Sequence, residues 1–181
     1  TGWRLGMLNR ELPRYQYQRL RWQRRGWSER PALLFEVAFQ GIANMSLLAL
    51  PAIFLAANPD PRLSPLELFA CLLWCTSFCF EVVADAQKLR FGLRMKAAGR
   101  KGMPCDEGLW KYSRHPNYFG EWMVWNALCL VTIPSLLYLA GAQPWWLTTC
   151  GGVSLVFLSY TMYMVLTHYS GAVPAEYYSA R

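Results

Sequence analysis

The stretch WWLTTCGGVSLVFLSYTMYMVLTHY, residues 145–169, runs for 25 residues without a single Asp, Glu, Lys or Arg. A helix on the surface of a soluble protein carries a polar face, and this stretch has no charged residue with which to form one. At about 1.5 Å per residue it is longer than the roughly 20 residues that cross a bilayer core of about 30 Å. The stretch therefore predicts a transmembrane helix.

Three further apolar stretches of similar length precede it. Within all four, only Glu36, Glu67, Glu81 and Glu121 are charged, although the chain contains 18 Lys and Arg and 11 Asp and Glu residues. A hydrophobic content of 54% with 16% charged residues also excludes a disordered chain. We predict an all-α integral membrane bundle of four transmembrane helices, at residues 32–57, 63–84, 117–140 and 145–169.

The basic residues lie on alternate connections between these stretches. Residues 1–31 and 85–116 hold eight each, Arg181 follows the last stretch, and only Arg62 lies on the opposite side. By the positive-inside rule both termini are cytoplasmic. We expect residues 1–31 to form a basic amphipathic arm and residues 32–181 to form a membrane domain whose segment 85–116 faces the cytosol. Because the chain begins without Met, we also expect it to be part of a longer membrane protein.

Polar side chains recur at helical spacing near the cytoplasmic end of every predicted span. They are Glu36, Gln40 and Asn44, then Glu81, Asp85 and Lys88, then Asn117, Glu121 and Trp125, and finally Tyr160, Tyr163 and Thr167. An ionisable residue at the centre of a span costs about 2.5–3.5 kcal/mol or more and so points to function. Taken singly, each also fits a helix end, an ion pair or an aromatic belt. Their shared depth favours an internal pocket open to the cytosol.

The segment 85–116 and the start of the next span mix cations with aromatic side chains such as Trp110 and Tyr118. This mixture suits a ligand with phosphates and a flat ring, although membrane topology and anionic lipids explain the same charge. A membrane-anchored loop of this length argues against nucleic acid, and no metal-ligand spacing or Gly-rich phosphate loop occurs. Asn117 stands where we predict the N-cap of the third span.

The segment LWKYSRHPNYFGE, residues 109–121, resembles the signature of the steroid 5-alpha-reductase C-terminal domain superfamily, and is most similar to its bacterial, largely uncharacterised membrane branch. Phe80-Glu81 and the segment ADAQK at residues 84–88 are similar to that branch as well. Related members include sterol reductases and isoprenylcysteine carboxyl methyltransferases. The resemblance implies the last four helices of a seven-helix fold in a bacterial inner membrane.

The resemblance also implies NADPH as the cofactor. By motif position, the implied cofactor-binding residues are Asp85, Lys88, Arg94, Lys101, Trp110, Arg114, His115, Asn117, Tyr118 and Glu121. Among them, Asn117, Tyr118 and Glu121 would contact the nicotinamide end, and Arg94, Lys101 and Arg114 the phosphates. For the substrate pocket, the candidates are Glu36, Gln40, Trp125 and Tyr163.

Three functions fit these residues and the resemblance. The leading hypothesis is NADPH-dependent reduction of a C=C bond in a lipophilic enone or steroid-like substrate. In the family the group that polarises the substrate carbonyl comes from earlier helices, so we assign no catalytic residue. The alternatives are a methyltransferase that uses S-adenosylmethionine on a lipid or prenylated thiol, and a non-enzymatic lipid-binding protein. The sequence predicts no oligomeric state.

Overall fold

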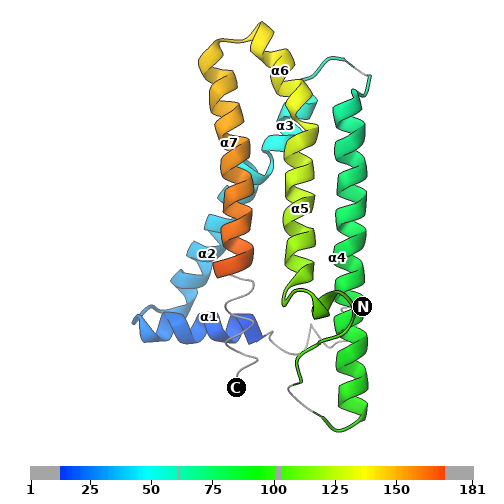
Figure 1. The fold of residues 1–181 in the computed structure, drawn as a ribbon. Helices are drawn as coiled ribbons and strands as arrows, with labels where there is room; N and C mark the ends of the chain where they lie inside the picture. Colours follow the sequence, from blue (N-terminus) through cyan, green and yellow to red (C-terminus); the bar gives the residue numbers. More distant parts are fainter. Residues whose placement is uncertain (1–12, 61, 101–102, 170–181) are drawn as a thin grey trace. The chain divides into compact units, whose positions relative to one another are not determined.

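A computed structural model describes residues 13–60, 62–100 and 103–169, and within these ranges the regular structure is entirely helical (Figure 1). Four helical segments are long and apolar enough to cross a membrane: Glu29–Ala56, Pro65–Ala97, Pro116–Ala142 and Trp145–His168. The prediction of an all-α bundle with four membrane-spanning helices is confirmed. The predicted site residue Lys101 lies outside the described residues.

The chain divides into two compact units, residues 1–46 and residues 47–181. The division falls within a π-helical turn, η1 (Asn44–Leu48), between α2 (Glu29–Ala43) and α3 (Leu50–Ala56). Pro51 lies in the first turn of α3, and a proline cannot donate the backbone hydrogen bond that a continuous helix needs. The first predicted span is therefore interrupted. The predicted arm boundary at residue 31 marks a change in charge, whereas this division marks a change in packing.

In the first unit, α1 (Pro13–Arg24) crosses the beginning of α2 (Figure 1). The side-chain amide of Gln18 donates to a carboxylate oxygen of Glu36 at 2.8 Å. Arg19 forms an ion pair with Glu29, the first residue of α2, at 2.5 Å. Two adjacent residues of α1 thus fasten it to the first two turns of the membrane span.

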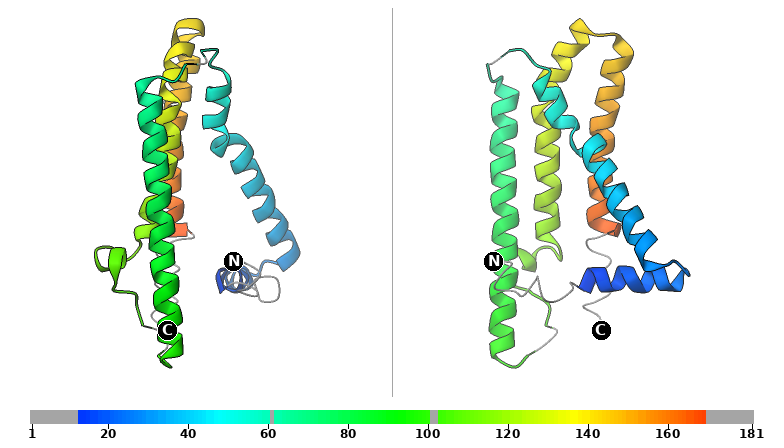
Figure 2. Two further views of the ribbon diagram at one scale, coloured as in Figure 1. Left: turned by 90° about the vertical axis from the view of Figure 1, so that its right-hand side faces the viewer. Right: turned by 180° about the vertical axis from the view of Figure 1, so that it is seen from behind.

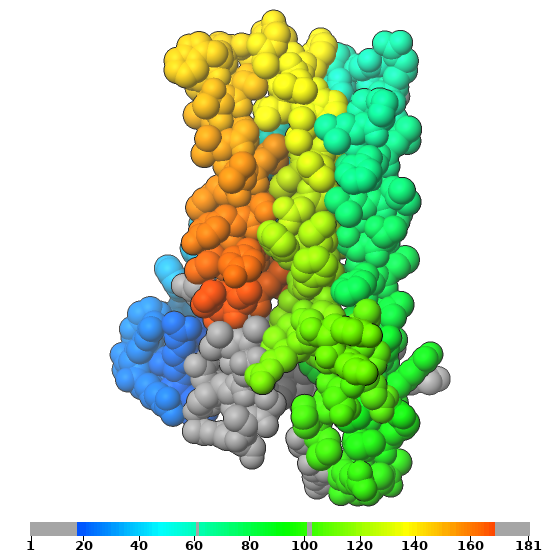
Figure 3. Space-filling model, viewed as in Figure 1, coloured from blue at the N-terminus to red at the C-terminus, as the bar shows by residue number. Residues whose placement is uncertain are grey.

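In the second unit, α4 (Pro65–Ala97), α5 (Pro116–Val131) and α7 (Trp145–Met164) stand in one layer with α5 in the middle (Figures 1 and 2). Side chains of α5 adjoin those of α4 on one side and those of α7 on the other (Figure 3). Trp122 Nε1 donates to the carbonyl oxygen of Ser159 at 3.1 Å, and Ser159 Oγ donates to Asn126 Oδ1 at 2.7 Å. These hydrogen bonds join α5 to α7 within the membrane.

The start of α4 has a complete capping box. Ser64 Oγ accepts from the backbone N–H of Glu67 at 3.2 Å, and the Glu67 carboxylate accepts from the backbone N–H of Ser64 at 2.6 Å. In the preceding connection the side-chain hydrogen bond from Arg62 lowers the pKa of Asp60. With 33 residues α4 is about 50 Å long, so it extends well beyond a bilayer core of about 30 Å. We define the basic end as the end of the unit where α4 finishes and α5 begins.

The third predicted span, residues 117–140, is not one helix. It consists of α5 and α6 (Ile133–Ala142), which meet at the fully buried Thr132. Pro134 has no backbone N–H to continue the ladder of α5, which explains the break. The helix of the second predicted span, 63–84, continues beyond it, because α4 runs to Ala97.

Candidate functional site

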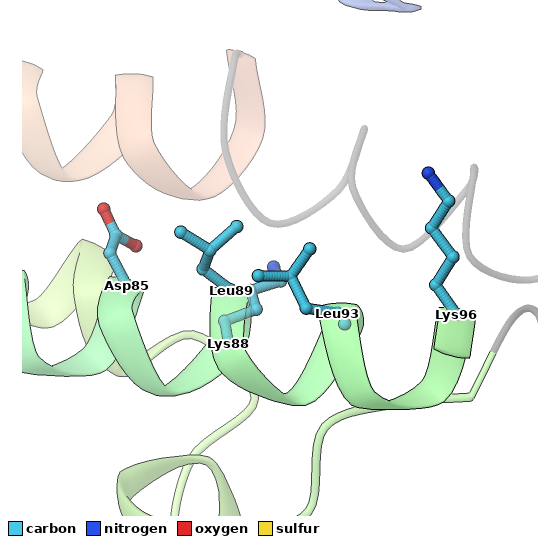
Figure 4. Close-up of a pocket in the computed structure, with 6 residues that line it drawn as sticks. Asp85, Lys88, Leu89, Leu93 and Lys96 are labelled. Atoms are coloured by element: carbon cyan, nitrogen blue, oxygen red, sulfur yellow. The ribbon is translucent and has the colours of Figure 1, made fainter. Parts of the chain in front are cut away.

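Beyond residue 84, α4 carries a groove of about 410 Å³ at the basic end. Asp85, Leu89 and Lys96, which line it, project to one side of the helix (Figure 4). Its lining also includes Lys88, Gly92 and Leu93. The groove therefore combines one carboxylate, two ammonium groups and an apolar floor.

The strap, which we define as residues 107–112, lies against this part of α4. It contains a 3-10 turn, η2 (Gly108–Lys111). The backbone N–H of Leu109 donates to Gln87 Oε1 at 2.8 Å, and the Trp110 indole N–H donates to the carbonyl oxygen of Ala84 at 2.8 Å. With Trp110 only 7% exposed, the strap is anchored by a buried aromatic side chain and two hydrogen bonds.

Two cations of α4 complete this anchoring. Lys88 Nζ lies 4.3 Å from the centre of the Trp110 ring, a cation–π distance. Arg94 pairs with Glu107 at the beginning of the strap. Both cations were predicted as cofactor residues, and both contact the strap.

Gly108 is required for this arrangement. Its φ of +57° lies in the left-handed region, and a Cβ built on it would lie 2.4 Å from Gln87 Oε1. Gln87 and Gly108 were missed as functional residues because a contact between residues 21 positions apart leaves no periodic signal in the sequence. The glycine alone, between Glu107 and Leu109, is the one local indication of a turn.

The strap leads directly into the start of α5. His115, with φ −141° and ψ 60°, is the N-cap, and Pro116 occupies the first turn. The prediction that Asn117 is the N-cap is therefore wrong. Proline is favoured at the first helical position, since its missing N–H needs no partner there, and it sets the cap one residue before itself. The His115 and Tyr118 rings stack 5.1 Å apart and nearly parallel.

Asn117 consequently lies inside the first turn of α5. Its side-chain oxygen, Oδ1, is buried and has no hydrogen-bond partner among the described residues. Buried polar atoms in folded proteins nearly always have a partner, and leaving one without costs about 1–3 kcal/mol. This oxygen is therefore a candidate acceptor for a ligand.

Three carboxyl groups gather where α4 meets α5. Glu81 interacts electrostatically with both Glu121 and Asp85, and Glu121 also interacts with Asp85. They come close because Gly120 packs directly on α4: a Cβ there would lie 2.9 Å from Glu81 Cβ and 3.1 Å from Glu81 Cα. The site thus brings three carboxyl groups together near Asn117, with cations further along α4.

A family model described as "protein of unknown function (DUF1295)" matches residues 2–180. The chain belongs to this family. No curated protein and no solved structure gives a significant match.

In this DUF1295 chain most of the predicted cofactor residues lie on α4, the strap and the start of α5. Asp85, Lys88, Arg94 and Trp110 belong to the first two elements. Arg114 is exposed just before α5, and the rest, His115, Asn117, Tyr118 and Glu121, occupy its cap and first turns. The structure therefore brings together residues separated by up to 36 positions in the sequence.

The predicted substrate residues belong to both units. Trp125 is half-buried one turn beyond Glu121, whereas the Tyr163 ring on α7 packs 5.9 Å from Trp122. Glu36 and Gln40 belong to the first unit. There the Glu36 carboxylate accepts its hydrogen bond from Gln18, and Gln40 is exposed.

Proposed function

We propose that this chain forms the cofactor-binding part of a membrane-embedded, NADPH-dependent reductase that reduces a C=C bond of a lipophilic enone or steroid-like substrate. The resemblance of residues 109–121 to steroid 5-alpha-reductases motivates the proposal. The observation that carries it is the oxygen of Asn117, which is buried and has no hydrogen-bond partner in the part of the chain that the structure describes. The proposed location is a bacterial inner membrane, with the basic end in the cytosol.

The donor and acceptor groups at the start of α5 fit a nicotinamide. Asn117 Oδ1 needs an N–H donor, and the carboxamide of nicotinamide has an NH₂ group that supplies one. The His115 and Tyr118 rings beside it form a flat stacked pair suited to an aromatic neighbour. Asn117 would orient the carboxamide, and the two rings would limit the access of water.

The carboxyl groups fit the direction of the proposed reaction. NADPH, when bound, supplies a hydride, and its nicotinamide ring gains positive charge as the hydride leaves. Each of Glu81, Asp85 and Glu121 that is ionised would place fixed negative charge where this positive charge develops, which favours the reduction electrostatically.

Cations that could contact the phosphates lie along the basic end. Lys88 lies beside the strap, and Arg114 precedes α5. Arg94 already shares its guanidinium with Glu107, so we expect it to contribute less. Trp125 and Tyr163 would contact the lipophilic substrate, whose carbonyl would be polarised by a group that we do not assign to this chain.

The carboxyl groups also permit a second candidate, a methyltransferase. S-adenosylmethionine carries a sulfonium cation, which the same negative charge would attract. Methyl transfer neutralises that cation, however, so fixed carboxylates stabilise the starting state more than the transition state. This difference favours the reductase.

A ligand titration distinguishes these functions and a non-enzymatic lipid-binding role. The full chain in detergent would be titrated with NADPH, NADH and S-adenosylmethionine, and its Tm recorded. We expect NADPH to raise the Tm most, and Glu121→Gln to reduce that rise because it removes one of the three charges. Glu67→Gln, at the far end of α4, is the control and should keep the rise. Stabilisation by S-adenosylmethionine alone, or by none of the three, contradicts the proposal.

A further inference from the structure

We propose that the described part of the arm is a docking surface for the phosphate groups of anionic membrane lipids. We define the arginine surface as Arg21, Arg24, Arg25 and Arg30. The inference concerns only the first unit and is independent of the cofactor and the reaction.

The position of α1 places this surface at the membrane boundary. Glu29 begins both α2 and the first candidate membrane span. Arg19 is paired with Glu29, and Gln18 with Glu36, so α1 is held across the beginning of that span (Figure 1). A helix fastened in this way lies along the membrane surface, at the level of the lipid headgroups.

The charge of the arginine surface is not balanced within the described protein. Between residues 18 and 31 the sole acidic residue is Glu29, which is engaged with Arg19. No member of the arginine surface forms an ion pair with another described residue, and Arg24, Arg25 and Arg30 are exposed. A guanidinium binds phosphate oxygens through two parallel hydrogen bonds, so the complementary partner is a layer of phosphates.

Apolar side chains beside these cations identify a lipid rather than a nucleic acid or an acidic protein. Leu20 is 53% exposed and Trp27 is 49% exposed, next to the arginines. The Arg25 guanidinium lies 6.0 Å from the centre of the Trp27 ring, which keeps cation and aromatic ring together. Exposed Trp and Leu among arginines match the boundary between headgroups and acyl chains, where both environments are available.

The test compares two bilayers. The full chain would be placed in nanodiscs of phosphatidylcholine alone, or of phosphatidylcholine mixed with phosphatidylglycerol, and amide hydrogen exchange of residues 18–30 would be measured. We expect slower exchange in the anionic discs, with the difference reduced by added NaCl. Each Arg→Gln substitution should weaken the lipid preference by a factor of about five, the equivalent of about 1 kcal/mol per cation. The variant with all four substitutions should show no difference between the bilayers.

Two controls keep the result specific. Arg62→Gln removes one exposed cation at the other connection and should leave the exchange of residues 18–30 unchanged. Inorganic phosphate added to the neutral discs should give no protection. Equal exchange in both bilayers, a difference that survives all four substitutions, or protection by free phosphate would overturn the proposal.

Discussion

Two asparagines on α5 differ in how their side chains are satisfied. Asn126 Nδ2 donates to the carbonyl oxygen of Trp122 at 2.7 Å, and Asn126 Oδ1 accepts from Ser159 Oγ at 2.7 Å. Asn117 Oδ1, nine residues earlier, is buried without a partner among the described residues. A satisfied amide stabilises the fold, whereas an unsatisfied one lowers its stability until a ligand supplies the missing donor. We therefore expect opposite effects from replacing them.

Asn126→Ala should lower the free energy of unfolding by about 1–3 kcal/mol, because the hydrogen bond from Ser159 on α7 is lost. The rise in Tm caused by NADPH should persist. Asn117→Ala should leave the Tm of the unliganded protein nearly unchanged and should abolish that rise. Thermal unfolding in detergent with and without NADPH measures both. A loss of stability in Asn117→Ala together with an intact NADPH effect would remove Asn117 from the site.

At the scale of the elements, the site depends on how closely α4 and α5 approach. Gly120 allows the two backbones to meet at Glu81, since any Cβ there would collide with the Cα and Cβ of that residue. Gly92, also on α4, has no described residue within 4 Å of the same position. The two glycines therefore form a matched pair, one required by packing and one not.

Gly120→Ala should destabilise the protein by about 1–3 kcal/mol through overpacking, and it should also weaken NADPH binding by moving Glu121 away from Glu81. Gly92→Ala should be neutral or stabilising by up to about 1 kcal/mol, because alanine favours the helix. Unfolding in detergent and NADPH titration test both variants. Equal stability of the two proteins would contradict the close packing of α4 on α5.

The strap offers a test of coupling between two residues. Gly108→Ala should release the strap, because the new Cβ collides with Gln87 Oε1 and the residue needs a positive φ. In the double variant, Gln87→Ala should relieve the collision, while the penalty of about 1 kcal/mol for a positive φ at position 108 remains. The loss in free energy of unfolding should therefore be smaller in the double variant than the sum of the losses in the two single variants. Hydrogen exchange of residues 107–112 reports the release. Strictly additive effects would mean that these side chains do not meet.

The elements differed in how far the sequence could predict them. The four spans followed from the distribution of charge, because a bilayer excludes charged residues along a whole helix. The break at Thr132 follows from Pro134, a local effect that the continuous hydrophobicity of residues 117–140 does not reveal. A short turn at residues 107–112 was predictable, but its contacts with α4 were not, since the bonds from Trp110 to Ala84 and from Leu109 to Gln87 depend on tertiary structure.

For the candidate site too, the sequence predicted which residues to consider but not their contacts. The motif predicted Asn117 and Glu121 as site residues, but it did not reveal that the Asn117 oxygen is buried with no partner in residues 13–60, 62–100 and 103–169. Hydrogen-bond satisfaction is a property of three-dimensional packing. The spacing of Glu36 and Gln40 suggests a pocket, which stays a prediction, and the hydrogen bond from Gln18 in the arm to Glu36 was not predictable from that spacing.

At the scale of the whole molecule, the distribution of cations predicts that the basic end is cytoplasmic. Cys105 is half-buried beside the strap, and the other five cysteines lie within the candidate spans. A membrane-impermeant maleimide should therefore label Cys105 in inside-out vesicles and not in right-side-out vesicles. The variant Asn58→Cys, in the connection between α3 and α4, should show the reverse pattern. Labelling of Cys105 from the outside would invert the proposed topology.

The claim that Asn117 receives the nicotinamide carboxamide is tested most directly with two cofactors. One is NADPH, and the other is its acetylpyridine analogue, in which a methyl group replaces the carboxamide NH₂. We predict that the wild-type chain binds NADPH about tenfold more tightly than the analogue, the equivalent of about 1.4 kcal/mol for one buried hydrogen bond. We also predict that Asn117→Ala binds the two equally. An undiminished preference for NADPH in Asn117→Ala, or no preference in the wild-type chain, would contradict this assignment.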